Sequence, residues 1–150
     1  MQVQELGHIV LYVRDLERSA AFYEDVLGWR RITPDDMPFP AAAFSSGRTH
    51  HELLLIEVGP DAAAPPRGRH FGLYHIGLKI GDHDDDLREA LTQLRAANVE
   101  IVGTSDHTVS HSIYLLDPDG NEIELYVDVA GVDWEKNPEL VMAPVRPLAL

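Results

Sequence analysis

Two histidines, His8 and His75, stand at matching points of an internal repeat. Residues 8–15 read H-I-V-L-Y-V-R-D, and residues 75–82 read H-I-G-L-K-I-G-D. Such a repeat predicts two similar structural units, and a histidine at the same point of two paired strands can bring two imidazoles to one place. Glu124, late in the second unit, could add a carboxylate. Two histidines and one carboxylate form the facial triad of non-haem Fe(II) oxygenases, which leaves coordination positions open.

Each of these residues also has an ordinary structural interpretation. A histidine in a strand is commonly a core residue whose hydrogen bonds are satisfied, and a glutamate in a strand commonly faces solvent. The duplication favours the metal site, because it gives His8 and His75 a geometric reason to meet.

The residues that follow each histidine predict the same order of elements, βαβββ. Alternating apolar residues predict the strands, Asp15 and Gly28 mark the two ends of the first helix, and D-P-D-G-N at 117–121 is a strong turn signal. Both faces of the first strand are mostly apolar, so we expect both to be covered. The expected elements are strand 6–14, helix 15–27 and strands 29–32, 41–45 and 52–58, then strand 72–80, helix 84–97 and strands 100–102, 113–116 and 122–127.

The same pattern predicts how the chain is organised. Pro60, Pro65 and Pro66 mark a linker between the two units. We expect the C-terminal tail, which has no clear period, to pack across the body of the protein or onto a partner chain. The expectation is a single domain over residues 1–150, with repeat one at about 5–59 (including a loop at 34–40), a linker at about 60–70, repeat two at about 71–129 and the tail at 130–150.

The composition excludes several classes of function. The net charge of −13 argues against nucleic-acid binding, which needs a basic surface. The absence of cysteine excludes disulfides and thiolate metal sites. No apolar run reaches the roughly 20 residues that span a bilayer, and no secretory signal is seen, so we expect a cytoplasmic protein without a membrane partner. Nucleotide-binding and serine-hydrolase motifs are absent.

The paired repeats, the two H-I-x-L openings and the sequence D-P-D-G-N-E-I-E-L-Y at 117–126 resemble the vicinal oxygen chelate superfamily. That superfamily includes glyoxalases, bleomycin- and fosfomycin-resistance proteins, epimerases and extradiol dioxygenases. The resemblance covers about residues 5–128. It implies an α+β fold in which two paired βαβββ repeats form an open, barrel-like mixed sheet around a metal site, with His8, His75 and Glu124 as the metal ligands.

Three segments resemble the extradiol dioxygenase branch in particular. They are H-E-L-L-L, beginning at His51, D-H-T-V-S, containing His107, and the tyrosine Tyr114, ten residues before Glu124. The resemblance implies Fe(II), or Mn(II), as the cofactor, and a catechol-type substrate that reacts with O2. It implies that His51 is the acid–base residue, that Tyr114 donates a hydrogen bond to the substrate and that His107 lines the pocket.

The chain departs from that branch in two respects. The stretch from Ser110 to Asp117 is shorter than in the larger enzymes, which leaves His111 as a competitor of His107. The chain also has a single pair of repeats where many extradiol enzymes have two, so it would be a one-domain member. Because open sheet edges need cover, we expect a homodimer or higher homo-oligomer, whose repeats pair within a chain or between chains.

Other functions on the same fold remain open at this point. A glyoxalase- or epimerase-type isomerase or lyase would need a fourth protein ligand. Glu57 is the candidate because it lies 67 residues before Glu124, although a shorter alignment sets Leu54 opposite Glu124. A drug-binding resistance protein would usually lack the ligand set, and a fosfomycin-type thiol transferase would need a pocket rich in lysine and arginine. The pattern does not identify the substrate.

Overall fold

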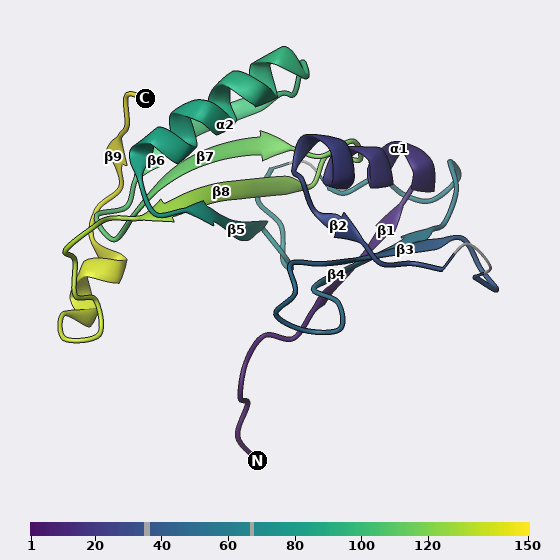
Figure 1. Cartoon of the computed structure of the whole chain (residues 1–150), viewed down its shortest axis with the longest axis horizontal. Coiled ribbons are helices and arrows are strands. Elements are labelled where there is room, and N and C mark those ends of the chain that lie inside the picture. The colour runs from purple at the N-terminus through teal and green to yellow at the C-terminus, as the bar shows by residue number, and fades with distance from the viewer. Residues whose placement is uncertain (35–36, 67) are drawn as a thin grey trace. The chain divides into compact units, whose positions relative to one another are not determined.

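Each repeat folds as a helix packed on its own β-sheet (Figure 1). The computed structural model describes residues 1–34, 37–66 and 68–150, so Asp35 and Asp36 of the expected loop and Arg67 of the expected linker lie outside the described residues. Two compact units are present, Met1–Pro65 and Pro66–Leu150. The predicted α+β class and the βαβββ order of each unit are confirmed. Neither sheet closes into a barrel within the described ranges.

The first unit is a four-stranded sheet in the order β1-β4-β3-β2. Strand β1 runs parallel to β4, and the other pairs are antiparallel. The helix begins after Asp15, whose carboxylate accepts a hydrogen bond from the Arg18 amide at 3.0 Å, and it stops before Gly28, whose φ is +70°. Both predicted ends of the helix are therefore confirmed. The elements are β1 (Ile9–Val13), α1 (Leu16–Ala21), which continues into the π-helix η1 (Phe22–Val26), β2 (Arg30–Arg31), β3 (Ala41–Ser45) and β4 (Leu53–Glu57).

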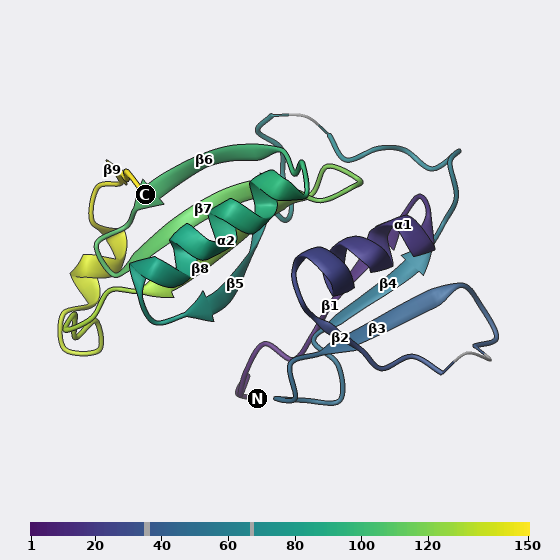
Figure 2. The ribbon, with the colours of Figure 1, turned by 45° about the horizontal axis from the view of Figure 1, so that its top comes forward.

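Strand β1 buries only one of its two faces. Leu11 and Val13 are buried, whereas Val10 is 44% exposed and Tyr12 is 70% exposed. Within the first unit α1 contacts the sheet on one side only, so this unit by itself does not cover both faces of β1 (Figure 2).

The second unit is a five-stranded sheet in the order β5-β8-β7-β6-β9, with α2 lying across one face (Figures 1 and 2). Leu87, Leu91 and Leu94 of α2 are buried, as are the side chains at alternate positions of β7 and β8. The predicted turn after β7 is confirmed, since the Asp117 carboxylate accepts from the amides of Asp119 and Asn121 at 2.9 and 2.8 Å. The elements are β5 (His75–Gly81), α2 (Asp84–Ala96), β6 (Ile101–Asp106), β7 (Ser110–Leu116), β8 (Glu122–Asp128), the 3-10 helix η2 (Pro138–Met142) and β9 (Arg146–Pro147).

The C-terminal tail packs on the sheet of its own unit. Strand β9 pairs antiparallel with β6, and the Thr104 hydroxyl donates to the Leu148 carbonyl at 2.7 Å. Arg146 forms an ion pair with Asp106 at 2.9 Å. The sequence predicts that the tail packs either on the body of the protein or on a partner chain, and it packs on the body. Its pairing covers part of β6, which would otherwise be an edge strand. None of the described helices has the length and apolar character needed to cross a membrane.

The face of the second sheet that α2 leaves open carries polar residues. Side chains on a strand alternate between the two faces, so the residues between the buried ones of β7 and β8 share this open face. The face carries His75 and Gly77 from β5, Ser112 and Tyr114 from β7, and Glu122 and Glu124 from β8.

Candidate metal centre

Glu124 is the centre of a hydrogen-bonded cluster in the second unit. Its Oε1 accepts from the hydroxyl of Ser112 at 2.6 Å and from the hydroxyl of Tyr114 at 3.0 Å. Its Oε2 lies 3.1 Å from Nε2 of His75. The register explains this arrangement, because β8 sets Glu124 opposite Tyr114 on one side and opposite Gly77 on the other.

One ring nitrogen of His75 faces Glu124, and within the described ranges the other has no hydrogen-bond partner. Its Nδ1 is buried and has no hydrogen-bond partner among the described residues. A carboxylate oxygen of Glu122 lies 3.8 Å from Nδ1, which is beyond hydrogen-bond distance. Imidazole and carboxylate are ligands that divalent iron, manganese and zinc accept. A buried, unpaired ring nitrogen beside two carboxylates therefore fits a metal site better than a closed structural network.

Tyr114 and His107 form a pair beside Glu124. Nε2 of His107 lies 2.7 Å from the Tyr114 hydroxyl and 3.9 Å from Oε1 of Glu124. Burial and the negative charge of Glu124 raise the pKa of Tyr114 above its usual value, so the phenol keeps its proton at neutral pH. His107 lies in the turn between β6 and β7, and the next residue, Thr108, has φ +73° and donates its amide to Asp106 at 2.7 Å.

His111 points away from this cluster. Its Nδ1 lies 2.6 Å from a carboxylate oxygen of Asp84 at the start of α2, and its Nε2 lies 3.8 Å from Asp106. Odd-numbered residues of β7 face α2, whereas Ser112 and Tyr114 face the open side. Of the two competing histidines, His107 is therefore the one that lies beside Tyr114 and Glu124.

The first unit holds a second group of imidazoles. The ring centroids of His8 and His51 are 4.5 Å apart, and Nδ1 of His51 lies 2.6 Å from Nδ1 of His50. Burial, then the neighbouring His50 and His8, lower the pKa of His51, which favours a neutral ring that can accept a proton. Arg48 holds the segment before His8, since its Nη2 donates to the carbonyls of residues 6 and 7 at 3.1 Å each.

Glu57 does not occupy the position that a fourth ligand would need. In the first unit Val10 pairs with Leu54, just as Gly77 pairs with Glu124 in the second, so Leu54 matches Glu124. Glu57 lies three residues further along β4, on the opposite face. Its Oε2 accepts from the amide of Leu16, the first residue of α1, at 2.8 Å. The interpretation of Glu57 as a metal ligand is therefore wrong, and its carboxylate stabilises the start of a helix.

The structure thus gathers the predicted site residues in two groups. His75, Glu124, Tyr114 and His107 lie together in the second unit, and His8 and His51 lie together in the first. Across residues 1–34, 37–66 and 68–150, no group of three or more histidine, aspartate and glutamate side chains that could hold a metal ion is found. Sequence analysis did not find Ser112 or Arg48; the one available signal for Ser112 was its spacing of two residues from Tyr114.

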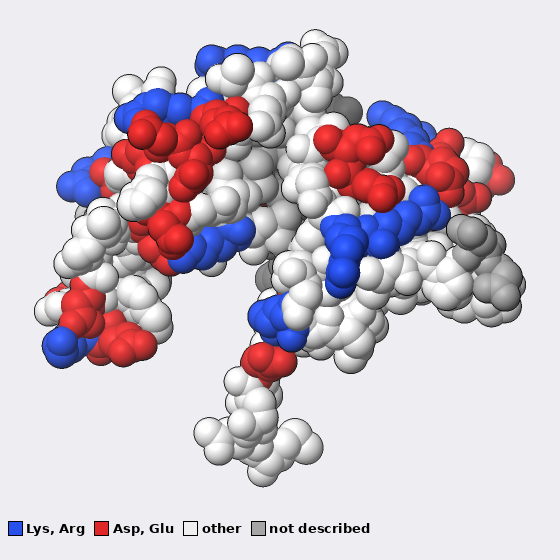
Figure 3. Space-filling view, viewed as in Figure 1, with Lys and Arg blue, Asp and Glu red and all other residues white. Residues whose placement is uncertain are grey.

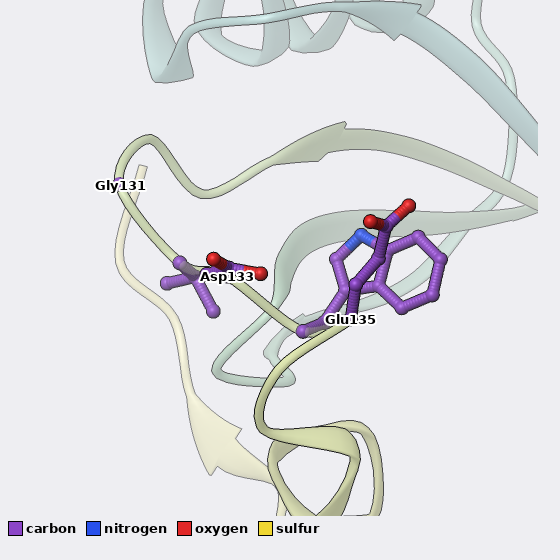
Figure 4. A pocket seen from close by; sticks show the side chains of 5 residues that line it. Gly131, Asp133 and Glu135 are labelled. Atoms are coloured by element: carbon purple, nitrogen blue, oxygen red, sulfur yellow. The ribbon is translucent and has the colours of Figure 1, made fainter.

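A shallow, open hollow in the tail is lined by residues 131–135, and Asp133 and Glu135 are seen beside it in Figure 4. Acidic and basic side chains are interspersed on the face shown in Figure 3, and the basic ones drawn there form no unbroken surface within the described ranges.

Most of the chain is similar to known proteins. The sequence profile of the Glyoxalase/Bleomycin resistance protein/Dioxygenase superfamily matches residues 5–125. Catechol-2,3-dioxygenase of Bacillus subtilis (strain 168) is 36% identical over 134 residues, which cover 89% of this chain but only 45% of that protein. Metallothiol transferase FosB of Lysinibacillus sphaericus (strain C3-41) is 27% identical over 127 residues, covering 84% of both proteins.

Solved structures show the same fold. The crystal structure of lactoylglutathione lyase from Agrobacterium tumefaciens matches with a TM-score of 0.62 and 27% identity, covering 85% of this chain and 96% of that one. The relatives thus share one fold and carry different activities, so the activity of this chain has to be argued from its own residues.

Proposed function

The chain belongs to the Glyoxalase/Bleomycin resistance protein/Dioxygenase superfamily, and on that premise we propose that it is a metal-dependent extradiol dioxygenase. Its substrate would be a catechol-type small molecule, and its second substrate would be O2. The name of the Bacillus subtilis relative supports this proposal, although this chain spans less than half of that protein.

The observation that carries the proposal is the difference between Glu124 and its counterpart. Glu124 carries two hydroxyl donors and faces His75, whereas the matching position of the first unit is Leu54. One carboxylate and two histidines make a three-ligand set that leaves positions open, as oxygen chemistry requires. A four-ligand isomerase site would need a second carboxylate, and Glu57 is engaged at the start of α1.

We propose His8, His75 and Glu124 as the metal ligands, with Fe(II) as the metal and Mn(II) as the alternative. A bound metal of this kind would supply a site that both adjacent oxygens of a catechol can chelate, with a further position for O2. The approach of Oε2 of Glu124 to Nε2 of His75 supports the choice of these two ligands.

The remaining residues would handle protons and orient the substrate. His51, whose lowered pKa favours the neutral ring, would accept a proton from a substrate hydroxyl and return it when the O–O bond breaks. Tyr114 keeps its proton and would donate a hydrogen bond to a substrate oxygen, and His107 would hold the phenol in place. Both atoms of O2 enter the product, and the ring opens to a muconic semialdehyde type of acid.

The test is anaerobic loading of the full chain with Fe(II), followed by a panel of catechols and air. Yellow absorbance with equimolar oxygen uptake is the expected result. His51→Ala should keep the metal and lose most of the turnover, whereas His75→Ala should lose the metal. No colour from a protein with confirmed metal would reject the dioxygenase activity and favour the isomerase or transferase chemistry of other relatives.

A homodimer and a cytoplasmic location remain predictions from the sequence. Light scattering after size-exclusion chromatography would give the mass in solution, and a mass of one chain would reject the dimer.

A further inference from the structure

We propose that Ser112 is the residue that fixes Glu124 in its metal-binding orientation, and that Tyr114 is a releasable donor on the same oxygen. This inference rests on the metal site of the proposed function and goes beyond it. It divides two hydrogen bonds on one carboxylate oxygen into two different roles. Ser112 is a positioning residue in this scheme, because it acts on the metal through Glu124.

Ser112 is well placed to act as a permanent anchor. Its side chain is 0% exposed, and its hydroxyl lies 2.6 Å from Oε1 of Glu124. Its backbone lies in β7, paired with Tyr126 on one side and Ser105 on the other, so it is held by two neighbouring strands. A serine hydroxyl turns about a single side-chain torsion next to this fixed backbone. The donor therefore has little freedom to leave the carboxylate.

The Tyr114 hydroxyl interacts with Ser112 and has two further partners that differ in kind. Its hydroxyl contacts Oε1 of Glu124 at 3.0 Å and Nε2 of His107 at 2.7 Å. The hydrogen bond from Tyr114 to Oε1 of Glu124 is 3.0 Å long, whereas that from Ser112 is 2.6 Å long. The donor of the longer bond also lies at the tip of a long side chain. A substrate oxygen could replace Glu124 as the acceptor of the phenol proton while His107 keeps the ring in place. Ser112 would then be the donor that remains on Oε1.

The two carboxylate oxygens of Glu124 have different partners, so a hydrogen bond that fixes one of them also orients the other. Oε1 receives both hydroxyls, whereas Oε2 faces Nε2 of His75 at 3.1 Å. Gly77 lies directly opposite Oε2, and even a Cβ at that position would be in ordinary van der Waals contact with it, at 3.5 Å. Holding Oε1 thus leaves Oε2 directed at the metal ligand His75. Outer partners of metal ligands commonly contribute 10- to 100-fold to metal affinity.

The test measures metal binding on the full chain in the absence of any catechol. Mn(II) affinity is followed by the electron paramagnetic resonance signal of the free ion, and Fe(II) affinity by anaerobic competition with a chelator. Ser112→Ala should weaken both by about 10- to 100-fold. Ser112→Thr, which keeps the hydroxyl, should restore most of the affinity. Tyr114→Phe should change affinity by less than about threefold, because Ser112 remains, and should lower turnover instead.

Ser110→Ala is the matched control, since Ser110 lies two residues earlier on the same face of β7. It should leave metal affinity unchanged. Thermal melting of the metal-free variants checks that each is folded. If Ser112→Ala does not fold, Ser112→Thr is the variant that tests the proposal. A folded Thr variant with wild-type metal affinity supports the anchor, and a folded Thr variant with weakened metal affinity overturns it.

The outcomes separate this inference from the proposed activity. If folded Ser112→Ala binds metal as the wild type does, or if Tyr114→Phe loses as much affinity as Ser112→Ala, the division of roles is overturned. A wild-type chain that binds neither ion overturns the anchor and the metal site together. Weakened metal binding in Ser112→Ala, combined with a wild type that produces no colour from catechols, supports the anchor and rejects only the dioxygenase activity.

Discussion

Replacing Glu57 separates a three-ligand site from a four-ligand site. Its Oε2 accepts the amide hydrogen of Leu16, one of the donors that a helix start leaves unpaired. A hydrogen bond of this kind contributes a net of about 1 kcal/mol to the free energy of unfolding, and the charge at a helix start adds about 0.3–1 kcal/mol. Glu57→Ala should therefore lower the melting temperature by roughly 3–8 °C, at about 2–4 °C per kcal/mol for a chain of this size. Glu57→Gln should lose mainly the smaller charge contribution.

The assay pairs differential scanning calorimetry of the metal-free protein with metal affinity by chelator competition. Asp15→Ala is the matched control, because its carboxylate accepts from the Arg18 amide at the same helix start. Both variants should melt earlier and bind metal as the wild type does. A Glu57→Ala protein that loses its metal to the extent of His75→Ala, while Asp15→Ala keeps it, would refute the assignment of Glu57 to the helix and restore the four-ligand site.

Two further predictions concern the supports of the two groups of site residues. Arg48→Ala should speed hydrogen exchange of the Ile9 amide, which donates to the Glu52 carbonyl beside the segment that Arg48 holds, by up to about 30-fold, since two lost hydrogen bonds contribute about 1 kcal/mol each; unchanged exchange would contradict this role of Arg48. The Thr108 amide and Arg146 lower the pKa of Asp106, so its contribution to stability is present above the unfolded value of about 3.9 and is lost as the pH falls through the lower folded value. Asp106→Asn should accordingly have a lower melting temperature than the wild type at pH 7 and the same melting temperature below the folded pKa of Asp106. A difference in melting temperature that stays constant with pH would show that the ionised carboxylate is not its cause.

The fold was predictable where local signals agree with the final pairing. The alternation of residues 122–127 and the helix ends at Asp15 and Gly28 needed no tertiary information. Strand β6 was harder, because the apolar stretch ends at Val102 while the strand runs on to Asp106. Pairing with β7 and β9, rather than side-chain hydrophobicity, extends it. Tertiary context commonly overrides local preference in this way for strands.

The candidate site was predictable in its residue types and less so in its connections. The period of two along β7 and β8 sets Tyr114 and Glu124 on one face once the strands are known to pair. Ser112 could not be recognised beforehand, since a serine in a strand has many ordinary uses and only the register brings its hydroxyl to Glu124. The error over Glu57 has the same origin, because an offset of 67 residues ignores which face of β4 each residue occupies.

The two repeats share a scaffold but differ in chemistry at matching positions of the register. The pairing of β3 with β4 matches that of β7 with β8, so Ala41 corresponds to Ser112 and Ala43 to Tyr114. Leu54 corresponds to Glu124 in the same frame. The first repeat therefore keeps its histidine and carries alkyl groups where the second carries a carboxylate and its two donors. Of the ligands proposed above, the duplication repeats only the histidine, so the proposed set has two imidazoles and a single carboxylate. This asymmetry favours the proposal of an open, oxygen-compatible metal site over a closed four-ligand one.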